Sequence, residues 1–112
     1  PGDKWLVLGD MRELGPTAAE LHAESGRFAR AAGFTRLYAL GEYSRAAAIA
    51  FGDGGTHFTG VDALIADLRR HLQDYAEAPA VLIKGSRGMR MERVVAALVD
   101  AGPLVAGPEG HG

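Results

Sequence analysis

The fold of this 112-residue chain is decided by the stretch AVLIKG at residues 80–85. Its first four residues are all apolar, which is typical of a strand buried on both faces of a parallel sheet. Two further predicted strands, at residues 5–8 and 36–40, also stop at a glycine. Residues 56–59 predict another strand, and its more polar composition suits the edge of a sheet.

A helix is predicted after each of these strands. Leu21, Phe28 and Ala32 recur at helical spacing ahead of Gly33, and they mark the apolar face of the first helix. A second helix is expected to start at Ser44, which can cap it. The apolar stripes of the later helices lie at residues 45–51, 62–75 and 91–99.

The order of elements is strand and helix in alternation, four times over. This order predicts an α/β domain with a doubly wound, mostly parallel sheet and helices on both faces. We expect one domain over residues 1–101, followed by a flexible Gly/Pro-rich tail at 102–112.

Composition narrows the classes of function. A net charge of -2 argues against a nucleic-acid partner, and the absence of any apolar run of about 18 residues argues against a membrane partner. The lack of cysteine fits a cytoplasmic protein. The four histidines lack metal-ligand spacing, so no metal site is expected. His71 is expected to face solvent, and so is His22, with the cleft as the alternative for His22.

The candidate binding site lies where the strands end, because ligands of open parallel sheets bind beyond the carboxyl ends of the strands. The loops at this edge are rich in charged and polar residues. The candidate substrate-binding residues are Asp10, Met11, Glu13, Glu42, Ser44, Lys84, Gly85, Ser86, Arg87 and Arg90. No catalytic residue is expected in this domain.

Cations gather at the start of the last predicted helix. Arg87, Arg90 and Arg93 stand near its positive end, where each costs about 0.3–1 kcal/mol unless an anion such as a phosphate or carboxylate docks there. The alternative is that these arginines are solvated and their stems cover apolar surface. Asp10 and Glu13 are open to two interpretations, as a paired acid and base or as loop carboxylates that hold backbone N–H groups and arginines.

Nucleotide-binding motifs are missing. The sequence has no G-x-x-x-x-G-K-[ST] loop and no G-x-G-x-x-G fingerprint, so it carries no nucleotide-cradling loop of its own.

Several segments together resemble the C-terminal domain of the Mur ligases, over roughly residues 5–99. They are LGDMRELG at 8–15, LH at 21–22, GE at 41–42, IKGSR at 83–87 and ME at 91–92. Within the family, the resemblance is to members that join D-alanyl-D-alanine to UDP-N-acetylmuramoyl-tripeptide in peptidoglycan synthesis. It implies that the chain is one domain of a longer ligase whose absent central and N-terminal domains bind the UDP-sugar and hold ATP and Mg²⁺.

The resemblance also implies roles for the loop residues. Lys84 and Arg87 would form charge-assisted hydrogen bonds to the dipeptide carboxylate and phosphate oxygens, with donors from Ser86 and the backbone at Gly85. Asp10, Glu13 or Glu42 would receive the dipeptide ammonium or hold the arginines. Alone, the chain is expected to fold without catalysing. The alternative from a different class is a stand-alone α/β module that binds a small anionic ligand.

Overall fold

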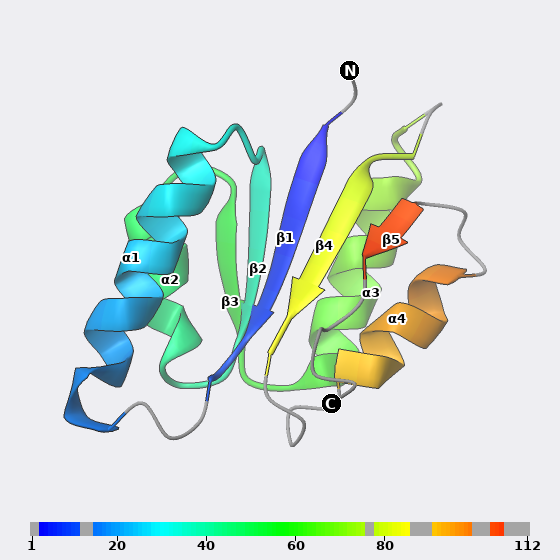
Figure 1. The fold of residues 1–112 in the computed structure, drawn as a ribbon. Coiled ribbons are helices and arrows are strands. Elements are labelled where there is room, and N and C mark those ends of the chain that lie inside the picture. Colours follow the sequence, from blue (N-terminus) through cyan, green and yellow to red (C-terminus); the bar gives the residue numbers. More distant parts are fainter. Residues whose placement is uncertain (1–2, 12–14, 76–77, 86–90, 100–103, 107–112) are drawn as a thin grey trace.

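Five parallel strands form a single sheet in the order β3-β2-β1-β4-β5 (Figure 1). The computed structural model describes residues 3–11, 15–75, 78–85, 91–99 and 104–106. The strands are β1 (Lys4–Gly9), β2 (Arg36–Leu40), β3 (Gly55–Phe58), β4 (Ala80–Lys84) and β5 (Leu104–Ala106). The predicted parallel sheet is therefore confirmed, with the polar strand β3 at an edge.

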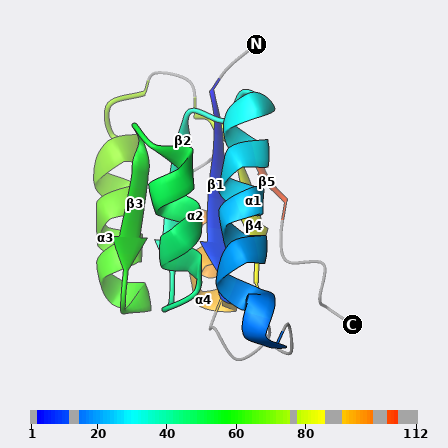
Figure 2. The same ribbon diagram turned by 90° about the vertical axis from the view of Figure 1, so that its left-hand side faces the viewer.

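The helices cover both faces of the sheet, as predicted. One pair, α1 and α2, lies on one face, and the other pair, α3 and α4, lies on the opposite face (Figures 1 and 2). The helices are α1 (Ala18–Ala31), which follows a short 3-10 turn at Gly15–Thr17, α2 (Ser44–Phe51), α3 (Val61–Leu72) and α4 (Met91–Val99).

Strand β1 lies at the centre, and its side chains alternate between two cores. Trp5 and Val7 are fully buried in the core under α3 and α4, whereas Leu6 and Leu8 are buried on the side of α1 and α2. This alternation follows from the two-residue period of a strand. It explains why β1 is apolar at every position between its ends.

Helix α1 buries a different face from the one that its sequence suggests. Its buried residues are Ala18, His22, Gly26 and Ala29, while Leu21 and Phe28 are exposed. The reason is a close approach to α2, because a Cβ on Gly26 would lie 2.2 Å from the carbonyl oxygen of Ala47. Small residues therefore face the neighbouring helix, and the large apolar residues point away from it. The predicted apolar face and the expected exposure of His22 are both wrong.

His71 is also more enclosed than expected. It lies in the last turn of α3, where its Nδ1 is 2.9 Å from the hydroxyl of the buried Tyr38 and its ring packs edge-on against Trp5. Burial raises the pKa of Tyr38. The expectation that His71 is solvent-exposed is therefore wrong, because Tyr38 on β2 offers its hydroxyl group to the polar face of α3 that carries His71.

The predicted tail contains a strand. Residues Leu104–Ala106 form β5, which extends the sheet beyond β4, with Leu104 opposite Ala80. Three residues between glycines and prolines are too few to show a periodic pattern. The expectation of a loose tail from residue 102 onward is wrong at these three positions, which gain their order by pairing with β4.

The α1–α2 contact gives a prediction in which two effects have opposite signs. Replacing Gly26 with Ala improves helix propensity by about 0.5–1 kcal/mol, but the added methyl group collides with the Ala47 backbone. We expect the collision to dominate, with a net loss of about 1–3 kcal/mol in the free energy of unfolding measured by urea denaturation. The exposed Ser25→Ala variant should change it by less than about 0.5 kcal/mol. A more stable Gly26→Ala variant would contradict the close approach.

Candidate functional site

The parallel sheet brings three of the predicted loops to one edge. Asp10 and Met11 follow β1, and Glu42 and Ser44 follow β2. Lys84 is the last residue of β4, and Gly85 follows it. Leu8 and Lys84 are register partners, so the loops after β1 and β4 leave the sheet side by side. Glu13, Ser86, Arg87 and Arg90 lie outside the described residues.

Asp10 organises this edge by capping α2 from another loop. Its Oδ1 accepts the backbone N–H of Ser44 at 2.7 Å and the Ser44 hydroxyl at 2.8 Å, and its Oδ2 accepts the N–H of Tyr43 at 3.1 Å. The first N–H groups of a helix have no partner within the helix, so a carboxylate there satisfies donors and complements the helix dipole. Of the two interpretations of Asp10, the structure favours a loop carboxylate that holds backbone N–H groups.

The contact between Asp10 and Ser44 also explains the glycine at position 41, and it shows that the cap predicted for α2 is wrong. Gly41 has φ +110°, and a Cβ there would lie 2.5 Å from the Asp10 carboxyl carbon. Ser44 does not cap α2 with its own side chain. It is fully buried and donates two hydrogen bonds to Asp10.

His22 holds the loop after β1 through a hydrogen bond that was not anticipated. Its Nε2 accepts the backbone N–H of Met11 at 3.0 Å, and its Nδ1 lies 2.6 Å from the carbonyl oxygen of Ala18. Because a carbonyl only accepts, Nδ1 must carry the proton, and Nε2 must keep its lone pair for Met11. The geometry therefore requires a neutral imidazole. No local sequence pattern indicates this role, because the hydrogen bond joins residues 11 positions apart.

A second histidine, His57 on the edge strand β3, holds the loop after β2. The Nε2 of His57, on β3, donates to the carbonyl oxygen of Gly41 at 2.8 Å. The backbone N–H of Gly41 donates to Phe58 at 3.1 Å, and that of Asp10 donates to Leu40 at 3.1 Å. The loops after β1 and β2 are thus held by their neighbours before any ligand binds.

Two of the charged candidate residues at this edge have no partner among the described residues. The ammonium of Lys84 and the carboxylate of Glu42 are exposed, and neither forms a hydrogen bond or ion pair there. Arg93 differs, because its guanidinium pairs with Asp62 at the start of α3. It is therefore not one of the free cations suggested by the arginine cluster.

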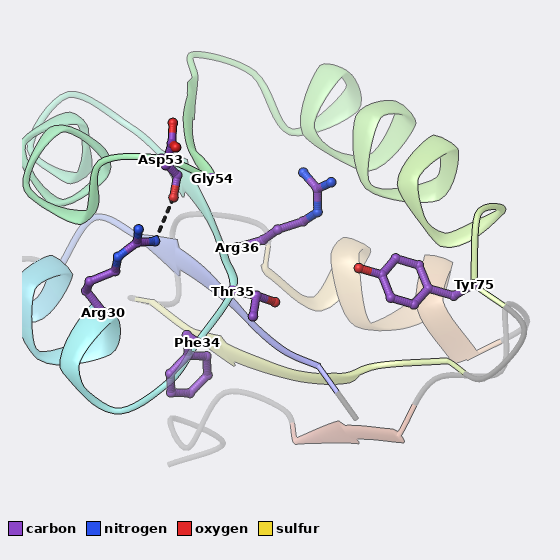
Figure 3. Close-up of a pocket in the computed structure, with 7 residues that line it drawn as sticks. All are labelled: Arg30, Phe34, Thr35, Arg36, Asp53, Gly54 and Tyr75. Carbon is purple, nitrogen blue, oxygen red and sulfur yellow. Dashed lines mark hydrogen bonds between the residues drawn. The ribbon is translucent and has the colours of Figure 1, made fainter. Parts of the chain in front are cut away.

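The opposite edge of the sheet carries a separate open hollow of about 640 Å³ (Figure 3). Arg30 and Arg36 line it, but Arg30 donates to the carbonyl oxygen of Asp53 at 2.8 Å and lies over the Phe51 ring. Arg30 thus joins α1 to the turn before β3. A hydrogen bond to Asp3 raises the pKa of Tyr75, which lines the same hollow.

No three His, Asp or Glu side chains in the described part of the chain come together as a metal site. Within the same residues, no helix has the length and apolar character needed to cross a bilayer.

Removing the Asp10 carboxylate should destabilise the domain. An Asp10→Ala variant loses the cap of α2 and leaves the buried Ser44 hydroxyl without its acceptor. We expect a loss of about 2–3 kcal/mol in the free energy of unfolding, measured by urea denaturation. The exposed Asp53→Ala variant serves as the matched control, with a change below about 0.5 kcal/mol. Equal stability of both variants would mean that the cap contributes nothing.

The role of His22 can be tested by measuring hydrogen exchange at the Met11 amide. Replacing His22 with Phe removes the acceptor of the Met11 N–H, whereas Gln supplies a side-chain oxygen in its place. Loss of about 1 kcal/mol of hydrogen bonding corresponds to roughly fivefold faster hydrogen exchange at Met11 in the Phe variant, measured by NMR. The Gln variant should stay closer to the parent. The Gly41 amide, which donates to Phe58, is the internal control. Uniform acceleration at both amides would indicate general destabilisation instead.

Comparisons with curated proteins and with solved structures both lead to one kind of enzyme. No known protein-family model matches the chain. The chain is 40% identical over 102 residues to the UDP-N-acetylmuramoyl-tripeptide–D-alanyl-D-alanine ligase of Escherichia coli. The aligned region covers 91% of this chain and 22% of the relative. The ligase of the same name from Bacillus subtilis is 31% identical over 107 residues, or 89% of this chain and 22% of the relative.

The fold agrees with these relatives. The crystal structure of MurF from Acinetobacter baumannii matches with a TM-score of 0.77 and 27% identity, over 89% of this chain and 23% of that one. The chain thus spans about a fifth of the length of the proteins that it matches. Over about nine-tenths of its own length, it is a homologue of one domain of the MurF ligases.

Proposed function

We propose that the chain is the C-terminal domain of a cytoplasmic, ATP-dependent ligase that joins D-alanyl-D-alanine to UDP-N-acetylmuramoyl-tripeptide. The homology to MurF supports this proposal. Within the chain, the observation that carries it is the Lys84 ammonium, which has no partner among the described residues and lies at the carboxyl edge of a sheet whose neighbouring loops are already held in place. In the proposed role, this edge presents the dipeptide and closes over the acyl phosphate.

The free charges at the edge suit a dipeptide that carries both signs. Lys84 can donate to its carboxylate or to phosphate oxygens, and Glu42 can accept from its ammonium group. Asp10 and Ser44 contribute differently, because their polar groups bond to each other and fix the loop that carries Glu42. Gly85, Ser86, Arg87 and Arg90 are proposed to complete the anion-binding side from the loop after β4.

The reaction also needs groups that lie elsewhere in the longer protein. ATP supplies the phosphoryl group that activates the tripeptide carboxylate, and Mg²⁺ accompanies it. The described residues form no metal site, and the sequence has no P-loop. In the proposed function, both ATP and Mg²⁺ are held by the central domain of the longer protein.

Closure of the domains is what gives the exposed charges their strength. Lys84 and Glu42 are exposed here, and ionic contacts in water are weak and screened. When other domains close over this edge and exclude water, the same contacts strengthen. The isolated chain is accordingly expected to lack ligase activity.

The test is a substitution in the full-length ligase. Replacing Lys84 with Ala should lower kcat/KM for D-alanyl-D-alanine by roughly 30- to 4000-fold, which corresponds to about 2–5 kcal/mol of transition-state stabilisation. The measurement is phosphate release as a function of dipeptide concentration. Arg69→Ala, on the exposed face of α3, is the matched control and should stay within about twofold.

Arg30 is an exposed arginine too, but it would be a poor control because its side chain bonds to the turn before β3. A Lys84→Ala ligase that stays folded and keeps its kcat/KM would overturn the proposed role of this edge.

A further inference from the structure

The open hollow at the amino ends of β2 and β3 has no part in the proposed function, and we call it the amino-edge hollow (Figure 3). Its volume is about 640 Å³, which lies within the usual range of small-molecule sites. The lining comes from three parts of the chain: the end of α1 with the turn into β2, the turn before β3, and Tyr75 after α3. A ligand here would therefore contact segments that are distant in the sequence.

Two arginines of this hollow have no carboxylate partner. Arg30 and Arg36 form no ion pair with any described residue, although arginines of α1, α3 and α4 elsewhere do. Arg30 donates to the backbone carbonyl oxygen of Asp53 at 2.8 Å. The guanidinium carbon of Arg36 lies 5.6 Å from the centre of the Trp5 ring. Because these partners are neutral, both guanidinium groups keep the capacity to bind an anion.

Burial sets Arg36 apart from the other arginines that lack an ion pair. Arg36 is half-buried, whereas Arg45 and Arg69 are exposed. A charged group that loses hydration is normally paired, because removing a charge from water costs free energy. A bound anion would offset this cost at Arg36.

The carboxylates near the hollow do not fill this role. Asp53 is the one acidic residue in the described lining, and its carboxylate points away from Arg30 (Figure 3). Asp3 accepts the hydroxyl hydrogen bond of Tyr75. The Thr35 hydroxyl lies in the lining and contacts the carbonyl oxygen of Lys4 only at 3.4 Å, so it is a further donor within the hollow.

We propose that the amino-edge hollow binds the phosphate group of a small molecule, with Arg36 and Arg30 as its cationic partners. The parallel N–H donors of a guanidinium match two oxygens of a phosphate, and such charge-assisted bonds are the stronger ones. Inorganic phosphate and phosphate esters share this chemistry. This inference does not rest on the proposed function, since the hollow and Lys84 lie at opposite edges of the sheet.

The hollow also offers room and contacts for an organic group. Phe34 and Tyr75 are half-buried aromatic residues in its lining. A phosphate group alone would fill only part of 640 Å³. An aromatic phosphate ester could therefore place its ring against these side chains, which an inorganic phosphate cannot do.

The test is a phosphate titration of the full-length protein, followed by amide NMR at constant ionic strength. At about pH 7.5 a phosphate ester carries close to two negative charges. We expect saturable shifts of the Phe34, Arg36 and Gly54 amides, with a Kd of about 0.1–10 mM, because the hollow is open to water. No saturable shift at these amides would overturn the proposal. Acetate is the control anion, and acetate binding as tight as that of phosphate would also overturn it.

Matched variants separate a site from general positive charge. Arg36→Gln and Arg69→Gln each remove one cation, and Arg69 lies outside the hollow. We expect Arg36→Gln to raise the Kd for phosphate at least about tenfold and Arg69→Gln to change it less than about twofold. Equal effects of the two would overturn the proposal. If Arg36→Gln does not fold, Arg30→Gln replaces it, with at least about fivefold weaker binding expected and an unchanged Kd as the contradicting result.

Phenyl phosphate identifies the source of the phosphate group. Tighter binding of phenyl phosphate than of inorganic phosphate supports the proposal and assigns an aromatic ester as the ligand. Equal or weaker binding, with saturable shifts retained, supports it with inorganic phosphate as the ligand. Shifts at Met11 and Lys84 report the carboxyl edge separately, so binding there does not count as binding in the amino-edge hollow.

Discussion

The carboxylate of Asp10 is the interaction on which the candidate site depends. It sits at the end of the central strand and accepts three hydrogen bonds from the first residues of α2. One side chain thereby joins the loop after β1 to the helix after β2 and satisfies donors that the helix itself cannot satisfy. The close fit also requires Gly41 at the turn, because a side chain there would collide with the carboxylate.

The other contacts at this edge extend the same constraint. His22 holds Met11 from α1, and His57 holds Gly41 from β3, so each loop is tied to an element on its far side. The polar groups used in this way are not available to a ligand. Among the candidate residues that the structure describes, Lys84 and Glu42 keep charged groups without a described partner, and these charges have opposite signs at one edge. The division between holding groups and free groups supports the proposal that this edge presents a zwitterionic dipeptide.

The close α1–α2 contact links the site to an apolar groove beside α1. Gly26 lets the two helices approach, and the helix then directs Leu21 and Phe28 away from α2. These side chains line a groove that also includes Met11 and Lys84.

The sequence by itself determined the parallel α/β fold, the edge position of β3 and the loops that carry the candidate residues, because periodicity and strand-ending glycines are local signals. Only the tertiary structure decided which candidates hold the loops and which are free. Asp10 and Ser44 are 34 residues apart, and the packing of His22 depends on which face of α1 meets α2. The three-residue strand β5 likewise exists through its pairing with β4. Contacts between distant segments leave no periodic pattern in the chain, since they depend on how its elements pack.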